Sequence, residues 1–468
     1  MVFSSITFLF IFLPLVLLVH YTISNRFRNL FLTFASLFFY AWGEQKLVML
    51  MIFSIALNYL GGLLIGQQKD KKSTKAFLLF FVSINVLTLV YFKYTNFFIE
   101  SVSNLGLFGS SSLKEIILPI GISFFTFQGM SYLIDIYYRR VSPQKSLISL
   151  ALYISMFPQL IAGPIVRYID ISKQIDSLRQ FNTLQFQQGI KRFITGLFKK
   201  VIIANQMGFI ADEVFSNTAD LGSISLWGGI ICYAFQIYFD FSGYSDMAIG
   251  LGKMFGFDFL ENFDHPYISR SIQEFWRRWH ISLSSWFRDY LYIPLGGNRK
   301  GVSRTYFNLI TVFFITGLWH GASWNFIVWG LYHGLFLILE RVWLGNVLMK
   351  NRIVGHIYTM LVVLIGWVFF RAETLSAAIT YIKHMFYFNF EGDQMVYQHF
   401  DLYFLFIAVL AVLFSTNIKY YITERILKIS KTSKPMLFGS YLVYMALFLV
   451  CIFELAESNY NPFIYFRF

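Results

Sequence analysis

Apolar runs of membrane-spanning length recur from one end of this chain to the other. A helix needs about 20 mostly apolar residues to cross the roughly 30 Å hydrocarbon core of a bilayer. The runs are continuous rather than alternating, which favours helices over the strands of a closed barrel. Only 13% of the 468 residues are charged, whereas soluble domains carry roughly 25%. The sequence therefore predicts an all-α polytopic membrane protein.

Basic residues gather in the short loops between the apolar runs and give the chain a formal net charge of +13. Because cytoplasmic loops of membrane proteins collect Lys and Arg, this charge indicates topology, and no nucleic-acid partner is expected. Basic loops alternate with weakly charged ones up to residues 139–146, which are predicted to lie inside. The loop 418–434 is also basic. The pattern predicts about twelve crossings with both termini outside.

Nothing in the sequence indicates cleavage, cross-linking or a second domain. The first apolar run, about residues 6–22, has no basic start and no small-residue cleavage site, so a retained first helix is predicted. Cys232 and Cys451 both lie in apolar runs, which predicts neither a disulfide framework nor a Cys-based metal site. No repeat or long linker is found, and a single transmembrane domain, residues 1–468, is expected.

Three stretches differ from continuous transmembrane helices. Residues 147–165 are apolar but interrupted by two prolines, which predicts a re-entrant or interfacial segment. Residues 270–288 carry aromatic residues at helical spacing with arginines on the polar faces, an amphipathic pattern that suits a membrane interface or a cavity wall. Residues 305–340 go out and back in two arms that are marginal for full crossings, so the turn at 319–324 is expected to lie below the outer surface.

His320 lies at this turn between Trp319 and Gly321. Polar groups within membrane segments are costly and often functional. An imidazole titrates near neutrality and suits general-base chemistry, and Gly321 is expected to leave room for a substrate. The alternative is a buried histidine bonded to a backbone carbonyl. His333 points elsewhere on the following helix and is expected to serve packing.

A second histidine, His280, follows Arg277 and Arg278 on the predicted cytoplasmic side. Because a guanidinium binds phosphate through several donors in a fixed fork, these arginines are candidates to bind a phosphate-bearing donor molecule. The alternative is that both arginines only snorkel at the bilayer interface.

Two carboxylates lie inside the apolar run at about 224–252. Asp240 with Tyr244, and Ser242 with Asp246, are each four residues apart and share helix faces. The pairs predict either the polar lining of a cavity or a packing network in which hydroxyls satisfy the acids. Glycine-rich phosphate loops, nucleophile elbows and zincin motifs are absent from the sequence, and no metal site is predicted.

Together these residues resemble the membrane-bound O-acyltransferase (MBOAT) family, closest to the bacterial branch that contains the membrane subunit of alginate O-acetyltransferase. The resemblance extends over essentially the whole chain. The segments that carry it are Pro119–Gln128, Ile161–Ile165, Tyr238–Asp246, Trp279–Tyr290 and Gly317–Ala322.

The resemblance implies a ring of tilted helices around a funnel, with re-entrant and amphipathic helices. It implies an enzyme that passes an acetyl group from a cytoplasmic donor, acetyl-CoA or an acyl carrier, across a bacterial cytoplasmic membrane. The acceptor would be an extracellular or periplasmic polysaccharide. An SGNH-hydrolase-like acetyltransferase outside the cell would collect the acyl group, and no bound cofactor is expected.

The resemblance also implies site residues. His320 and His280 would be catalytic, and Arg277 and Arg278 would bind the donor. The last residues, 462–468, resemble the family's C-terminal aromatic motif, in which Tyr465 would carry the acyl group. The residues expected to line the cavity are Asp240, Ser242, Tyr244, Asp246, Trp319, Ser323 and Asn325.

Two other functions stay open. One is a transporter or flippase without acyl chemistry; many such proteins show two related halves, whereas no second copy of the His320 hairpin is found. The other is D-alanyl transfer to teichoic acid. In that system the aromatic motif belongs to a separate small protein, so its presence here favours the O-acetylating branch.

Overall fold

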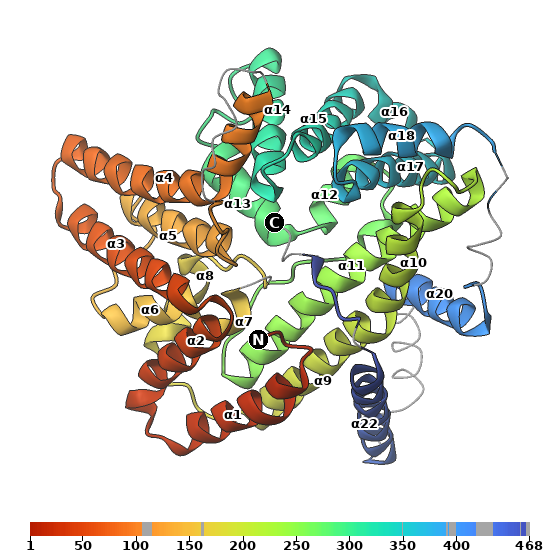
Figure 1. Ribbon diagram of the computed structural model, residues 1–468. Helices are drawn as coiled ribbons and strands as arrows, with labels where there is room; N and C mark the ends of the chain where they lie inside the picture. The colour runs from red at the N-terminus through yellow and green to blue at the C-terminus, as the bar shows by residue number, and fades with distance from the viewer. Residues whose placement is uncertain are drawn as a thin grey trace. The chain divides into compact units, whose positions relative to one another are not determined.

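Helices account for all the regular structure that can be described in this chain. The computed structural model describes residues 1–104, 115–160, 163–348, 350–389, 392, 399–417, 434–458 and 460–464, and contains no strand in those ranges (Figure 1). Seven helical segments in the described part are long and apolar enough to cross a membrane, which confirms the all-α polytopic class. The number of crossings, the positions of the termini and the ring-and-funnel arrangement stay predictions.

The chain divides into two compact units. The first unit comprises Met1–Arg192 with Ala248–Leu260, and the second comprises Phe193–Met247 with Glu261–Phe468. The expectation of a single transmembrane domain stays a prediction.

The first unit begins with a series of helices joined by short turns. These are α1 (Leu13–Thr22), α2 (Arg28–Glu44), α3 (Val48–Gln67), α4 (Lys71–Asn104), α5 (Ile122–Tyr137), α6 (Leu147–Ser155), α7 (Phe157–Leu160), α8 (Tyr168–Asp176) and the start of α9 (Thr183–Phe198). The apolar stretch 25–67 forms two helices because Gln45 adopts a φ of 40°, a left-handed value that ends α2.

The proline-interrupted stretch at 147–165 is a broken helix. The helix α6 ends at Ser155, and α7 is a single buried turn that contains Pro158. The Ser36 hydroxyl accepts a hydrogen bond from the Phe157 N–H at 3.1 Å and satisfies a backbone group at the break. Irregular backbone at membrane depth is tolerated where protein covers it, as the burial of α7 does here.

The second unit holds the motifs that the sequence singled out. Its helices are the end of α9, α10 (Asn205–Ser216), α11 (Ser223–Met254) up to Met247, α12 (Ile272–Arg278), α13 (Ile281–Phe287), α14 (Val302–His320), α15 (Trp324–Leu339), α16 (Gly345–Leu348), α17 (Arg352–Arg371), α18 (Leu375–Met385), α20 (Leu402–Ser415) and α22 (Lys434–Glu457). A π-helical turn, Lys199–Ala204, joins α9 to α10.

The expected hairpin at 305–340 is present as α14 and α15, which lie side by side (Figure 1). Two glycines permit the close contact. A Cβ on Gly317 would lie 2.2 Å from the carbonyl oxygen of Phe326, and one on Gly330 would lie 2.2 Å from that of Phe313. The hairpin therefore packs backbone against backbone, and this contact places the last residue of α14, His320, at the turn.

The amphipathic stretch at 270–288 forms two short helices, α12 and α13, rather than one. It breaks between α12 and α13, where His280 takes a φ of 46°. The break is stabilised from outside the stretch. The Asp264 N–H donates to the Arg278 carbonyl at 3.0 Å, and the Ile281 N–H donates to the Asn262 carbonyl at 2.9 Å. These two bonds satisfy backbone groups that a continuous helix would have paired internally.

Candidate active site

His320 lies in an aromatic enclosure at the end of α14. Its side chain is 2% exposed. The centroid of its ring lies 4.9 Å from those of Trp319 and Trp329 and 5.1 Å from that of Phe370. The residue that follows does not have its expected role, because a Cβ on Gly321 would lie 2.2 Å from the Phe326 ring. Gly321 therefore makes room for Phe326, not for a substrate.

His280 lies in a polar network, and its ring also contacts Trp319. Its ring centroid is 6.1 Å from that of Trp319 and 4.6 Å from that of Phe241. Its Nδ1 lies 3.1 Å from the Asn262 Oδ1, which also accepts from the Ser282 hydroxyl at 2.8 Å. Because this oxygen is an acceptor, Nδ1 carries the proton and Nε2 carries the lone pair.

The lone pair of His280 is buried. Among the described residues, His280 Nε2 has no hydrogen-bond partner. Burial lowers the pKa of His280 to about 3, so the ring is neutral at physiological pH. A neutral imidazole with an unpartnered Nε2 can accept a hydrogen bond.

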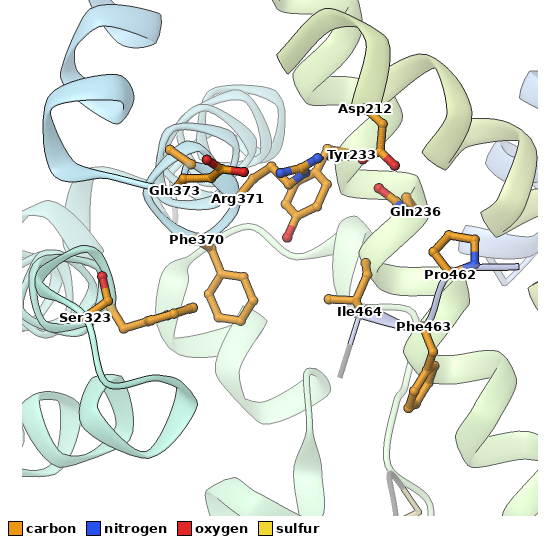
Figure 2. A pocket seen from close by; sticks show the side chains of 12 residues that line it. Asp212, Tyr233, Gln236, Ser323, Phe370, Arg371, Glu373, Pro462, Phe463 and Ile464 are labelled. Atoms are coloured by element: carbon orange, nitrogen blue, oxygen red, sulfur yellow. Dashed lines mark hydrogen bonds and ion pairs between the residues drawn. The ribbon is translucent and has the colours of Figure 1, made fainter. Parts of the chain in front are cut away.

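A cavity of about 180 Å³ lies within the second unit beside the enclosure of His320. Phe370, whose ring contacts His320, forms part of its wall, and Ile464 from the C-terminal segment faces Phe370 across it (Figure 2). The residues that line the cavity are Asp212, Tyr233, Gln236, Ser323, Phe326, Phe370, Arg371, Ala372, Glu373, Pro462, Phe463 and Ile464. The wall is mostly apolar, with a charged edge at Asp212, Arg371 and Glu373.

The C-terminal segment 460–464 follows α22 and is held by side chains of α10, α11 and the π-helical turn. The Tyr460 hydroxyl donates to Asp212 Oδ2 at 2.6 Å, and the Ile464 N–H donates to Asp240 Oδ2 at 2.8 Å. Lys200 Nζ donates to the carbonyl oxygen of Pro462. Tyr465, the predicted acyl carrier, lies outside the described residues.

Comparison with known proteins identifies the family. The model described as "MBOAT, membrane-bound O-acyltransferase family" matches residues 135–372, just over half of the chain. The chain belongs to the MBOAT family. The matched range includes both histidines and the hairpin of α14 and α15, and the protein is therefore a multi-pass membrane O-acyltransferase.

Several curated relatives cover most of the chain. A protein of Pseudomonas putida named "Probable alginate O-acetylase AlgI" is 41% identical, with 100% of both chains covered. The "Peptidoglycan O-acetyltransferase" of Helicobacter pylori is 40% identical over 82% of this chain and 80% of its own. The "Teichoic acid D-alanyltransferase" of Bacillus subtilis is 32% identical over 47% of this chain and 58% of its own.

The two carboxylates of α11 are each paired with a lysine in this MBOAT protein. Asp246 lies 2.7 Å from Lys199, and Asp240 lies 2.7 Å from Lys200. The sequence interpretation overlooked both lysines. Two adjacent lysines within the run at about 193–210 were the available signal, because a charge at membrane depth needs a partner.

Most of the remaining residues predicted to line a cavity contact the 180 Å³ cavity, its lining residues or His320. Ser323 lines it directly. Tyr244 packs its ring on Phe463 at 4.7 Å between centroids, and Trp319 lies against His320. Asn325 Nδ2 donates to the carbonyl oxygen of Ala372 at 2.7 Å and so ties the start of α15 to the end of α17. Ser242 is buried, and its hydroxyl has no hydrogen-bond partner among the residues that the structure describes.

The predicted donor-binding arginines have different surroundings. Arg277 is exposed, whereas Arg278 forms ion pairs at 3.0 Å with both Glu274 and Asp264. A larger cavity of about 810 Å³ lies at the other end of α12 and was not foreseen. Three arginines from different segments line it: Arg270, Arg341 and Arg352.

His333 is fully buried among aromatic rings, as a packing role requires. Its ring centroid lies 5.1 Å from that of Trp276 and 5.3 Å from that of Trp329. Within the described residues, no three His, Cys, Asp or Glu side chains gather as metal ligands would.

Proposed function

We propose that this MBOAT protein passes an acetyl group from a cytoplasmic donor across the membrane for the O-acetylation of a polysaccharide outside. Relatives named for O-acetylation match the chain over its full length or 82% of it, whereas the D-alanyltransferase matches 47% at lower identity. This contrast favours acetyl over D-alanyl transfer. The location is the cytoplasmic membrane of a bacterium, with both termini outside.

The observation that carries this proposal is the cavity shared by the C-terminal segment and the surroundings of His320. Pro462, Phe463 and Ile464 form one side, and Phe370, which contacts His320, forms another. Tyr465 is the next residue in the chain after Ile464. A tyrosine hydroxyl that enters this cavity would be adjacent to the enclosure of the catalytic imidazole.

The first chemical step is the acetylation of Tyr465. His320 takes the phenolic proton, and the phenolate oxygen attacks the carbonyl carbon of the acetyl thioester. The C–S bond breaks, and the leaving thiolate takes up the proton. A base is required because a phenol with a pKa near 10 is a poor nucleophile at pH 7.

The second step releases the acetyl group outside. A hydroxyl of the acceptor attacks the ester carbonyl, the bond to the Tyr465 oxygen breaks, and the phenolate regains a proton. Phenolate leaves more readily than an alkoxide, so the aryl ester is a good acetyl donor. An SGNH-hydrolase-like acetyltransferase with a nucleophilic serine is the partner proposed to collect the group and pass it to the glycan.

The donor is proposed to be acetyl-CoA or an acyl carrier, which approaches His280 from the cytoplasmic side. Two arginine groups are candidates for its phosphates, the pair Arg277 and Arg278 and the cavity with Arg270, Arg341 and Arg352. Arg278 already has two carboxylate partners, which reduces its capacity for a phosphate. Charge reversal of Arg277 with Arg278, compared with that of Arg341 with Arg352, identifies the group that binds the donor by the larger loss of donor affinity.

The test of the proposed function follows the acetyl group. Purified protein is incubated with acetyl-CoA that carries a labelled acetyl group, and the C-terminal peptide is examined by mass spectrometry. We expect a labelled acetyl group on Tyr465 that is absent from the His320→Ala variant. Tyr465→Phe keeps the ring and removes the nucleophile, so this variant should lose glycan acetylation at matched expression. Wild-type glycan acetylation by Tyr465→Phe would overturn the relay.

A further inference from the structure

A buried ion pair, Lys200 with Asp240, lies directly beneath the C-terminal segment. The two side chains are 3% and 2% exposed, and Nζ lies 2.7 Å from Oδ1. Removing two charges from water costs more than their attraction returns unless further hydrogen bonds satisfy both groups. The contacts that supply those further bonds therefore indicate what the pair does.

Several of those bonds go to the backbone of the C-terminal segment. Lys200 Nζ donates to the carbonyl oxygen of Pro462, and Asp240 Oδ2 accepts from the N–H of Ile464 at 2.8 Å. Lys200 Nζ also donates to the side chain of Asn205 at 2.9 Å, whose amide donates in turn to the carbonyl oxygen of Tyr460 at 3.2 Å. Three backbone groups within five residues are thus held by one connected set of side chains.

The helix that leads into this segment has much less support. Only 6% of the most apolar window of α22 is buried inside the protein, whereas Phe463 and Ile464 are both buried. Gln206 Nε2 donates to the Glu454 carboxylate at 2.9 Å near the end of α22. The position of the segment at the cavity therefore depends on contacts made by the segment itself rather than on the packing of α22.

We propose that Lys200 and Asp240 are positioning residues that fix the backbone at 462–464 in the wall of the cavity beside His320, directly before the proposed acyl carrier in the sequence. This inference rests on the proposed role of Tyr465 as acyl carrier. Bonds to backbone groups suit this task because they set the path of the chain without involving the side chains that face the cavity. One residue extends the chain by at most about 3.6 Å, so the point of attachment of Tyr465 is constrained by the bond at Ile464.

Two double variants remove both charges of the ion pair, and they differ in whether an acceptor for the Ile464 N–H remains. Lys200→Met with Asp240→Leu removes both bonds to the segment. Lys200→Met with Asp240→Asn keeps an oxygen that can accept from the Ile464 N–H. Neither variant leaves a buried charge unpaired, which is the usual reason that a broken ion pair destabilises a protein. The control is Gln206→Ala, which removes a contact to α22 and leaves the bonds to 460–464 in place.

Each variant is examined by three measurements: the rate of Tyr465 acetylation with the KM for the donor, hydrogen–deuterium exchange at the C-terminal peptide, and the temperature of unfolding. For the Met/Leu variant we expect a roughly tenfold to hundredfold lower rate, the size of one or two bonds to charged groups. The donor KM and the unfolding temperature should stay unchanged, and exchange at the C-terminal peptide should be faster. The Met/Asn variant should retain more of the acetylation rate than the Met/Leu variant. The Gln206→Ala control should retain the full rate.

Wild-type acetylation or wild-type exchange in the Met/Leu variant would overturn the positioning role. If Met/Leu does not accumulate, Asn205→Leu removes the bond at Tyr460 and provides the same comparison with a smaller expected loss. The relay itself fails if the wild-type protein carries no acetyl group on Tyr465. In that case the exchange measurement still decides whether the ion pair holds the segment, so the two failures are distinguishable.

Discussion

His320 and His280 both contact Trp319, yet their surroundings differ in kind. Aromatic rings enclose His320 at the end of a helix, beside a cavity that the C-terminal segment also lines. His280 lies in a helix break, and Asn262 fixes which of its ring nitrogens carries the proton. The first arrangement places an imidazole beside a cavity, and the second orients an imidazole by hydrogen bonds. Under the proposed function, His320 would therefore transfer the proton, and His280 would support the reaction on the donor side.

The largest expected effect comes from His320→Ala. Loss of a general base typically lowers the rate by about 10²–10⁴, and glycan acetylation at matched expression is the measurement. The matched control is His333→Phe, which replaces another buried histidine of the same hairpin with a ring that suits its aromatic neighbours. A merely twofold loss in His320→Ala, or an equal loss in the control, would contradict the assignment.

The next effect concerns the hairpin that holds His320. Gly317→Ala places a Cβ 2.2 Å from a backbone oxygen of α15, so the two helices must separate. Overpacking of this kind costs about 1–3 kcal/mol, and we expect a lower unfolding temperature together with lower acetylation. Gly439→Ala in α22 is the control, since nothing lies within 4 Å of its added Cβ. Equal behaviour of the two variants would show that the close contact is unimportant.

A smaller effect is expected when the network around His280 is altered. Asn262→Ala removes the acceptor that orients the ring, and loss of one such hydrogen bond corresponds to roughly tenfold in rate. Asn262→Asp keeps an acceptor at the same place and should retain more activity than Asn262→Ala. Kinetic measurements of donor use in the two variants test this order, and the reverse order would argue against a role for the orientation of His280.

The smallest effect is a pH dependence of stability. The folded state holds the pKa of His280 near 3, below the ordinary value of 6.5, because burial disfavours the charged ring. Between pH 6.5 and pH 3 the unfolded chain binds a proton at His280 that the folded protein does not bind. The free energy of unfolding therefore has its full His280 contribution above pH 6.5 and loses it as the pH falls toward 3.

His280→Gln removes this titration. The difference in unfolding temperature between pH 7 and pH 4 should therefore be smaller in this variant than in the wild type. Other titrating groups are present in both proteins and cancel in the comparison. An identical pH dependence in the two proteins would contradict the neutral, buried state of His280.

Several features of the site followed from local pattern. The turn that carries His320 was expected between two apolar arms, and α14 and α15 form that hairpin. The depth of the turn in the membrane stays a prediction. Asp240 and Asp246 were recognised because a carboxylate within an apolar run is conspicuous. The interruption at 147–165 was expected from its prolines. In each case the residues that cause the structural feature lie in the same short stretch of sequence that predicts it.

Other features depended on residues distant in the sequence. The break at His280 relies on Asn262, 18 residues earlier. The partners of Asp240 are Lys200 on another helical segment and Ile464, 224 residues away. Arg278 looked available for a phosphate, but Asp264 and Glu274 already neutralise it. Hydrophobic spacing predicted one amphipathic stretch at 270–288 because periodicity alone cannot show which backbone groups find partners elsewhere.

The sequence by itself determined that this chain is a helical membrane protein of the MBOAT family with a histidine at a hairpin turn. Bilayer thickness sets the length of apolar runs, and a run is a local property that sequence displays directly. The tertiary structure alone decided which charges are paired, how His280 is oriented and that the C-terminal segment reaches the cavity beside His320. Those outcomes depend on which groups meet in space, because a buried charge or backbone group is stable only with the partner that the fold provides.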